Sequence, residues 1–291
     1  MIRLEGLTLA YEEGGIHDLS LRVEAGEALG VLGPAGAGKS LLLRVLAGHL
    51  PADQGSASIK GLDSWSQRQQ VFREAVYLPS TPALEDMTGE AYLRFMAVYQ
   101  GRFNPEKARR LTEKMDITLT GQCPRMSPEN RRKLSLLAAL SQDASVFLLD
   151  EPFLGLSALA RGALMDTLRE LRGHGAAILL TSHVLEEVRS ACTQVAIIRK
   201  GRLVVSQPVE ALSLTRQKVY HITFATADEA AAFAREWENA VELIGTRALV
   251  AIPASPQALL RTLARYQVHD LVGGREEAEE GFLRYHGDDV L

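Results

Sequence analysis

One stretch of eight residues dominates this sequence: Gly33-Pro34-Ala35-Gly36-Ala37-Gly38-Lys39-Ser40. The stretch fits the pattern G-x-x-x-x-G-K-[ST] at every position. An apolar run at 28–32 predicts a buried strand before it, and residues 41–47 predict a helix after it. Because a strand, this loop and a helix in that order form the usual setting of the pattern, we interpret the stretch as a phosphate-binding loop.

The residue types in the loop explain how it would hold a nucleotide. Three glycines let backbone N–H groups turn inward around a phosphate, and the following helix directs its positive end at the same anion. Lys39 is expected to reach the β- and γ-phosphates, and the Ser40 hydroxyl to bind Mg²⁺. We therefore predict nucleotide contacts from Gly33 to Leu41. The alternative is a glycine-rich turn that binds nothing.

The composition is that of an ordinary soluble protein with one large domain or two modest ones. The 291 residues are 46% hydrophobic and 23% charged, and 32 basic against 36 acidic residues give a formal net charge of −4. This charge predicts no bulk attraction to nucleic acid, and we interpret the short cluster Arg131-Arg132-Lys133 as a solvated helix face. No apolar run approaches the roughly 18 residues of a membrane span, so we expect another chain to cross any membrane.

Strands and helices alternate between residues 1 and 212. Alternating residues at 2–11 and 19–23 predict two antiparallel strands ahead of the loop, and Tyr11 ends the first. A short strand and hairpin are expected at 56–62, strands at 75–78, 146–149 and 177–180, and a hairpin formed by 195–198 and 202–205. Helices are expected at 88–100, 105–115, from 127 onward, 163–171 and 185–191, with a polar stretch at 63–70. The alternation predicts an α/β core with a parallel sheet and a helical insert at about 80–142.

The pattern changes at about residue 213, which we take as a domain boundary. Residues 213–291 predict strands at 219–224, 241–244, 248–252 and 268–272, with helices at 227–237, 256–266 and 276–285. The order β-α-β-β-α-β is ferredoxin-like. Because this segment has no glycine-rich loop and no metal-ligand spacing, we predict a small α+β accessory domain without an active site of its own.

Two further stretches supply the groups that hydrolysis needs. Asp150 and Glu151 end the apolar run 146–149: the first is placed to hold Mg²⁺ and the second to act as general base on a water molecule. His183 ends another predicted strand, at the edge where open α/β sheets bind ligands. Taken alone it would more often be a structural histidine, but behind the two earlier motifs it predicts a sensor of the γ-phosphate.

The order of these motifs resembles the nucleotide-binding subunit of ABC transporters over about residues 1–212. The resemblance implies a P-loop NTPase of ABC type, with an antiparallel β subdomain and a helical subdomain. It also implies that Tyr11 stacks on adenine, that Gly33–Ser40 is the Walker A loop, that Asp150 and Glu151 are the Walker B pair and that His183 is the switch histidine.

Other segments of the chain extend the resemblance. Tyr77-Leu78-Pro79, Met87-Thr88-Gly89-Glu90 and the ferredoxin-like tail look most like subunits that serve exporter-type permeases with separate membrane chains. That implies an ATPase with ATP and Mg²⁺ as cofactors, positioned at the cytoplasmic face of the membrane through its permease.

Three departures from the family pattern concern the second subunit of the dimer. Where the family has Leu-Ser-Gly-Gly-Gln, this chain has Met126-Ser127-Pro128-Glu129-Asn130. Ser127 remains to contact the γ-phosphate on the partner, but Pro128 removes one N–H and Glu129 brings a carboxylate toward that phosphate. Ser80 stands where a glutamine usually reaches Mg²⁺, and Ser157 replaces the aspartate of the D-loop. We therefore expect a weakened half-site toward the partner.

Four functional hypotheses remain open at this point. We favour a homodimer with two atypical sites over an asymmetric pair with a different ABC subunit, because closed symmetric assemblies are the commoner form. A regulatory subunit with slow turnover is supported by Glu129 and opposed by Glu151. A soluble ABC ATPase acting on DNA or ribosomes resembles chains with coiled-coil insertions, zinc motifs or tandem ATPase domains, none of which is visible here.

Overall fold

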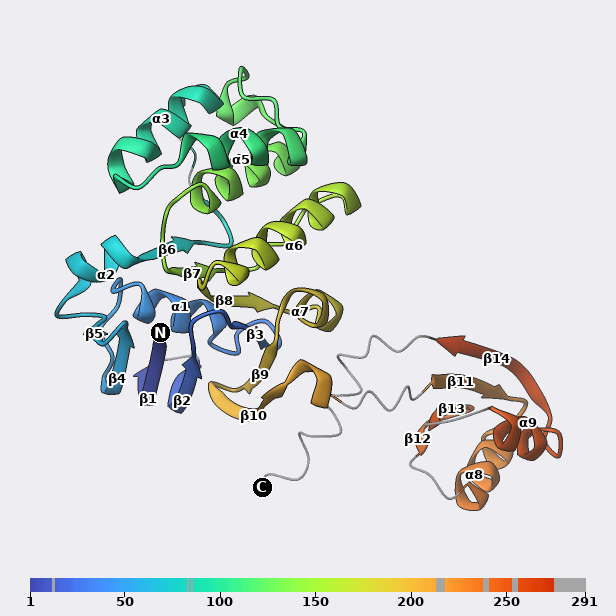
Figure 1. Cartoon of the computed structure of the whole chain (residues 1–291). Helices are drawn as coiled ribbons and strands as arrows, with labels where there is room; N and C mark the ends of the chain where they lie inside the picture. Colours follow the sequence, from blue (N-terminus) through green and yellow to red (C-terminus); the bar gives the residue numbers. More distant parts are fainter. Residues whose placement is uncertain are drawn as a thin grey trace. The chain divides into compact units, whose positions relative to one another are not determined.

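The computed structural model describes residues 1–11, 14–82, 84, 86–212, 218–237, 241–252 and 256–274 (Figure 1). The chain divides into two compact units, Met1–Ala211 and Leu212–Leu291. The helix expected at 276–285 lies outside the described residues. Within the described ranges, no helix has the length and the hydropathy needed to cross a bilayer.

An antiparallel sheet begins the first unit. Its strand order is β2-β1-β4-β5. The strands are β1 (Ile2–Ala10), β2 (Gly15–Val23), β4 (Gln54–Ile59) and β5 (Leu62–Asp63). Buried side chains of β1 and β2, such as Leu7 and Leu19, join one hydrophobic core with helix α1 (Lys39–Leu46). The β1–β2 pair confirms the two strands predicted ahead of the loop.

A six-stranded sheet positions the candidate site. Its order is β10-β9-β3-β8-β7-β6, with all neighbours parallel except β10 and β9. The strands are β3 (Ala28–Leu32), β6 (Ala75–Leu78), β7 (Val146–Leu149), β8 (Ala177–Ser182), β9 (Gln194–Arg199) and β10 (Arg202–Pro208). Every residue of β3, β7 and β8 is buried, which explains their unbroken apolar runs. The register pairs Leu32 with Ser182 and Leu149 with Leu180, so the predicted motifs that follow these strands share one sheet edge.

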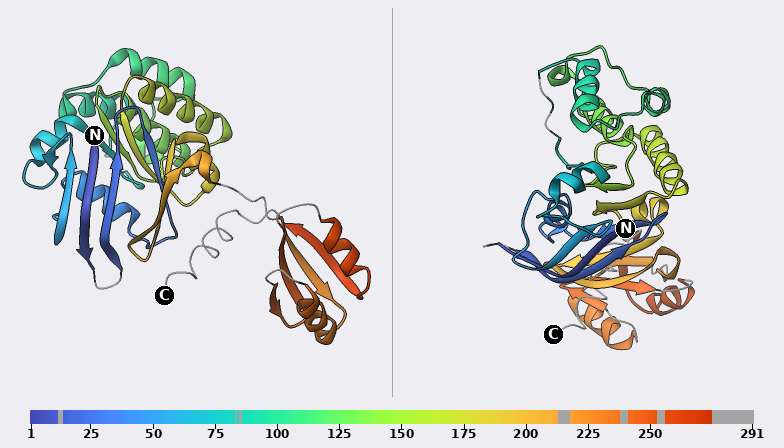
Figure 2. Two further views of the ribbon diagram at one scale, coloured as in Figure 1. Left: turned by 60° about the horizontal axis from the view of Figure 1, so that its bottom comes forward. Right: turned by 60° about the vertical axis from the view of Figure 1, so that its left-hand side comes forward.

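Some helices lie on the two sides of this sheet, and a separate group of helices lies beyond it (Figure 1). Helices α3 (Gly89–Gln100), α4 (Pro105–Met115) and α5 (Pro128–Leu140) form the predicted helical insert. Figures 1 and 2 show the parallel sheet between this insert and the antiparallel sheet. Thr88, Asn104 and Ser127 cap the three helices through their side chains.

Two other helices differ from the prediction. Helix α2 (Arg68–Glu74) occupies part of the expected polar stretch. It buries only Val71, and Gln67 before it makes no side-chain capping bond in the described part of the chain, so neither periodicity nor a cap marked it. Helix α6 (Ala158–Gly173) starts five residues earlier than expected, because Ala160 is buried against the core despite Gly162 in the next turn. Helix α7 (Leu185–Ala191) agrees with the prediction.

The second unit has the predicted ferredoxin-like order. Its elements are β11 (Lys218–Phe224), α8 (Ala227–Glu236), β12 (Val241–Ile244), β13 (Arg247–Ile252), α9 (Gln257–Leu263) and β14 (Val268–Gly274). The strands form one antiparallel sheet in the order β12-β13-β11-β14. Phe224 of the sheet and Phe233 of α8 pack with ring centroids 5.1 Å apart at the centre of its core.

Candidate nucleotide site

The loop between β3 and α1 has the conformation that its glycines permit. Gly36 and Gly38 have φ angles of +78° and +98°, which other residues rarely adopt. A Cβ at Gly38 would lie 2.7 Å from the carbonyl oxygen of Gly15, and one at Gly33 would collide with the carbonyl of Ile198. The loop therefore packs closely against β2 and β9, and it leads directly into the N-terminus of α1.

Lys39, the first residue of α1, reaches back over this loop. Its Nζ donates to the carbonyl oxygens of Gly33 at 2.5 Å and Pro34 at 3.1 Å, and only 8% of the residue is exposed. The Glu151 carboxylate lies 3.7 Å from the same Nζ. The positive charge of Lys39 is thus held where the loop and the end of β7 meet. Ser40, the next residue, is exposed in the first turn of α1.

The two acids after β7 lie in different environments. Asp150 is 1% exposed, and its Oδ1 accepts a hydrogen bond of 2.6 Å from the Thr181 hydroxyl. Burial and the charge of Asp150 raise the pKa of Tyr77 to about 12, so that the phenol stays neutral near the carboxylate. Glu151 has a φ of +46°, unusual for a residue with a side chain, and its N–H donates to Thr181 Oγ1 at 2.9 Å.

The side chain of Glu151 joins the predicted groups. Its Oε2 lies 3.0 Å from Nδ1 of His183, which follows β8 and is half exposed, while its Oε1 faces Lys39. Three residues predicted from separate motifs therefore meet: Lys39, Glu151 and His183. Tyr11 lies at the exposed end of the β1–β2 hairpin, and that end approaches the loop, because a Cβ at Gly14 would be 3.7 Å from the Gly36 carbonyl.

Arg132 of α5 is a site residue that the sequence interpretation missed. Only Arg131 of the cluster at 131–133 is exposed; Arg132 and Lys133 are 6% and 8% exposed, so the expected solvated face is wrong for both. Nη1 of Arg132 donates to the carbonyls of Pro79 and Ser80 at 2.9 and 3.1 Å. Nη2 donates to the carbonyls of Asp150 and Glu151 at 2.9 and 2.6 Å. Burial lowers the pKa of the guanidinium to about 10, and the two nearby carboxylates act in the opposite direction.

Residues 126–130, which stand where the family has Leu-Ser-Gly-Gly-Gln and are called the signature motif below, lie at the start of α5, outside the Lys39–Glu151–His183 cluster. Ser127 uses its hydroxyl to accept the N–H of Asn130 at 3.2 Å. Oε1 of Glu129 accepts the N–H of Ser157 at 3.1 Å and lies 3.4 Å from Nζ of Lys133. The hydrogen bond from Ser157 and the charge of Lys133 lower the pKa of Glu129, so this carboxylate is ionised near neutral pH. Two of the departures from the family pattern are thus in direct contact.

Replacing Glu129 by glycine is expected to increase ATP-driven dimer closure. The change removes an anion from the start of α5, where the family resemblance would bring the partner's phosphate. Sedimentation velocity of the full chain with ATP and Mg²⁺, on a Glu151→Gln background, measures the dimer fraction. Glu90→Gln, an exposed acid in the first turn of α3, is the matched control. Equal dimer fractions with and without Glu129 would contradict the repulsion.

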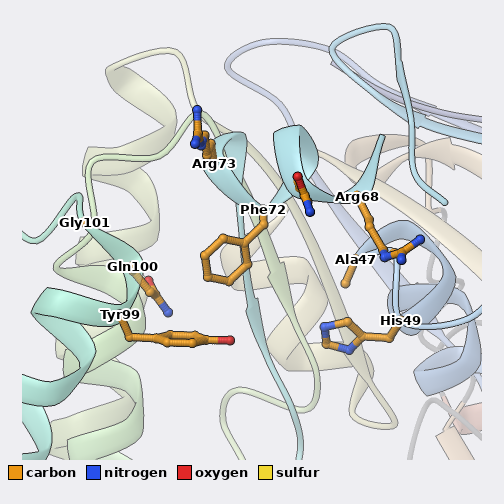
Figure 3. A pocket seen from close by; sticks show the side chains of 10 residues that line it. Ala47, His49, Arg68, Phe72, Arg73, Tyr99, Gln100 and Gly101 are labelled. Atoms are coloured by element: carbon orange, nitrogen blue, oxygen red, sulfur yellow. The ribbon is translucent and has the colours of Figure 1, made fainter. Parts of the chain in front are cut away.

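A concave surface lies where α1, α2 and α3 meet, on the first unit. The pocket has a volume of about 510 Å³ and is lined by residues 47–49, 68, 69, 72, 73 and 99–101. Figure 3 shows the rings of Phe72 and Tyr99 facing the hollow, with Arg68 and Arg73 at its border. Phe72 and Tyr99 are 38% and 61% exposed, and their ring centroids lie 5.4 Å apart. Exposed aromatic rings beside arginines are typical of protein contact surfaces.

The arrangement of motifs defines the class of protein first. A loop with the pattern G-x-x-x-x-G-K-[ST] after β3, two acids after β7 and a histidine after β8 are the elements expected of a P-loop nucleotide hydrolase. Comparison with known proteins gives the family. A family model described as "ABC transporter" matches residues 16–154. Together with a relative that is 31% identical over 79% of each chain, this match shows that the chain belongs to the family of ABC transporter ATP-binding proteins, which are ATPases.

Individual relatives support this membership. The Nod factor export ATP-binding protein I of Burkholderia lata is 31% identical over 242 residues, covering 79% of each chain. The daunorubicin resistance ATP-binding protein DrrA3 of Streptomyces coeruleorubidus is 29% identical over 99% of this chain and 96% of its own length. The manganese transport system ATP-binding protein MntB of Listeria monocytogenes is 29% identical over 80% of this chain and 99% of its own.

Solved structures agree with the fold. The structure of an ATP-binding subunit of an ABC transporter superposes with a TM-score of 0.67 at 28% identity, over 74% of this chain and 92% of that one. A dimeric bacterial ABC transporter cassette matches with a TM-score of 0.65 at 16% identity, over 72% of this chain and 99% of that one. The second likeness concerns the fold alone.

Proposed function

We propose that this chain hydrolyses ATP to power an ABC transporter whose membrane-spanning permease is a separate chain. The observation that carries the proposal is the cluster in which Glu151 contacts His183 at 3.0 Å and faces Lys39 at 3.7 Å, at the edge of the parallel sheet. A carboxylate fixed between a cation and an imidazole is suited to accept the proton of a water molecule that attacks the γ-phosphate.

The other predicted residues take complementary roles in this proposal. Backbone N–H groups of the loop 33–41 and Lys39 would bind the phosphates, and Tyr11 would stack on the adenine. Ser40 and Asp150 provide the oxygen donors that Mg²⁺ prefers, and both follow strands that end at the same sheet edge. Among the described residues no group of three or more His, Cys, Asp or Glu side chains could hold a metal. That fits an ion that is bound largely by nucleotide phosphates, whose charge Mg²⁺ would neutralise.

The partner that completes each site is proposed to be a second ABC subunit. The resemblance to the family implies that two chains enclose each ATP, and we favour a homodimer because symmetric closure is the commoner arrangement. A pair with a different subunit, in which this chain offers a regulatory half-site, is the second candidate. The contact of Glu129 with Ser157 favours it, because both residues lie on the surface expected to serve the partner's nucleotide.

The permease is proposed to dock into the pocket between α1, α2 and α3. Phe72 and Tyr99 offer apolar contacts there, while Arg68 and Arg73 suit a segment that carries an acidic side chain. Through this contact the chain would lie at the cytoplasmic face of the membrane. The relatives whose names refer to manganese transport, Nod factor export and drug resistance support a transport role.

Native mass spectrometry of the complex extracted from solubilised membranes tests the proposal. The Glu151→Gln chain is used with ATP and Mg²⁺ to hold the nucleotide-bound form. Two copies with membrane subunits support the homodimeric transporter, and one copy with a different ATPase supports the asymmetric pair. A complex without any membrane chain contradicts the transport function.

A pocket variant makes the same experiment specific for the docking site. The double change Phe72→Ala and Tyr99→Ala is expected to lower permease recovery about tenfold, because central aromatic residues carry much of the energy of protein interfaces. Nucleotide affinity is expected to stay unchanged. Leu260→Ala is the control, because Leu260 is an apolar residue on α9 whose exposure of 49% lies between those of Phe72 and Tyr99. Full permease recovery with the double variant would exclude this pocket as the docking site.

A further inference from the structure

Arg132 links three segments that are distant in sequence. It lies five positions after Ser127 on α5, yet its guanidinium bonds to the loop that follows β6, at Pro79 and Ser80. The same guanidinium bonds to the loop that follows β7, at Asp150 and Glu151. One side chain therefore connects the helix of the signature motif with both loops.

The bonds of Arg132 are directed at backbone carbonyls and not at carboxylates. Four carbonyl oxygens lie within 3.1 Å of its two terminal nitrogens, while its buried Nε finds no hydrogen-bond partner in the described part of the chain. A buried cation that leaves one donor unsatisfied is unfavourable unless its other bonds are strong. The four carbonyls provide those bonds, so they fix the position of both loops relative to α5.

The carbonyl of Glu151 is the acceptor with the clearest functional consequence. Glu151 has the left-handed φ of +46°, a strained conformation that persists only when its surroundings hold it. The N–H of Glu151 donates to the hydroxyl oxygen of Thr181. The carbonyl oxygen of Glu151 accepts one hydrogen bond from Arg132 and one from the N–H of Leu154. These contacts orient the peptide from which the carboxylate extends toward Lys39 and His183.

We propose that Arg132 is a positioning residue for ATP hydrolysis. It keeps the strained Glu151 and the loop at Ser80 at fixed positions relative to the start of α5. This inference rests on the proposed function, because it assumes that Glu151 is the general base. A displacement of α5 by the partner subunit at Ser127 is transmitted by Arg132 to Glu151. The signature helix thereby controls the geometry of the chain's own catalytic carboxylate.

The test compares three variants of the full chain in steady-state ATPase and nucleotide-binding assays. Arg132→Met removes the carbonyl bonds and keeps an unbranched side chain. Arg132→Lys keeps the charge but has a single nitrogen that cannot span both loops. Arg131→Met is the matched control, because Arg131 is the exposed neighbour on the same helix. All rates are divided by the concentration of nucleotide-binding sites, and thermal unfolding is recorded for each variant.

We expect kcat per binding site to fall about 100-fold in Arg132→Met, since a displacement of about 1 Å at a catalytic group has that effect. In Arg132→Lys, kcat per binding site should fall about tenfold. The Kd for ATP should change less than about threefold in both variants. The control Arg131→Met should have the kcat per binding site and the Kd for ATP of the wild type. A purely structural role would lower the unfolding temperature and the number of binding sites but leave kcat per site intact.

Two results would overturn the inference. One is an unchanged kcat per site in Arg132→Met; the other, decisive if that variant does not fold, is an unchanged kcat in Arg132→Lys. The wild type and Glu151→Gln are measured in parallel. Absent turnover in the wild type, or full turnover in Glu151→Gln, contradicts the proposed function itself and is thereby distinguished from a failure that concerns Arg132 alone.

Discussion

Replacing Lys39 by alanine is expected to weaken ATP binding at least about 100-fold, because one strong charge-assisted contact to phosphate contributes about 3 kcal/mol. Nζ of Lys39 lies over the loop, within 3.1 Å of two of its carbonyls, so its charge faces the proposed phosphate site. Alanine keeps the helix but leaves the loop with neutral donors alone. Titration calorimetry with ATP and Mg²⁺ measures the loss.

The control for this change is another lysine of the same unit. Lys60 forms an exposed ion pair with Glu74, and such pairs contribute little to stability. Lys60→Ala is therefore expected to keep the wild-type affinity. An Lys39→Ala chain that binds ATP with wild-type affinity would contradict the assignment of the loop as the phosphate site.

Replacing Glu151 by glutamine is expected to stop turnover and to preserve ATP binding. General base catalysis typically contributes about 10²–10⁴-fold to a rate, and an amide cannot take the proton of the attacking water. Glutamine has the same shape, so the backbone contacts of residue 151 with Thr181 and Arg132 remain. The phosphate loop is unchanged as well, and the Kd for ATP is expected to stay within about twofold.

Release of inorganic phosphate and binding of a fluorescent ATP analogue measure the two halves of this prediction separately. Glu106→Gln on α4 is the control, because Glu106 is an exposed acid whose ion pair with Arg109 lies within its own helix. Unchanged ATPase activity in Glu151→Gln would exclude Glu151 as the base. Loss of both binding and turnover would instead indicate that residue 151 holds the site together.

The sequence predicted the elements whose signals are local. Helix α4 begins at Pro105 and ends at Met115, as predicted, and β7 coincides with its apolar run. Helix α2 was missed because it buries a single residue, Val71. Its position depends on packing against β5 and β6, which no pattern within seven residues can encode.

The sequence predicted those residues of the candidate site that each belong to a recognisable motif. Lys39, Glu151 and His183 each follow a recognisable strand, and the parallel register brings them together. Arg132 was misread because three basic residues in a row suggest solvent. A signal for its burial did exist: α5 carries apolar residues on every side from Leu134 to Leu140, and a helix that is apolar all round is surrounded by protein.

The bond between Glu129 and Ser157 makes the residue types at positions 129 and 157 depend on each other. If Ser157 reverted first to the aspartate of the family, its carboxylate would arrive beside that of Glu129, and the two like charges would repel. If Glu129 reverted first to glycine, Ser157 would lose only the acceptor of an exposed N–H, which water can replace. An aspartate at position 157 is therefore compatible with glycine at position 129 but not with glutamate, whereas a serine at position 157 is compatible with either.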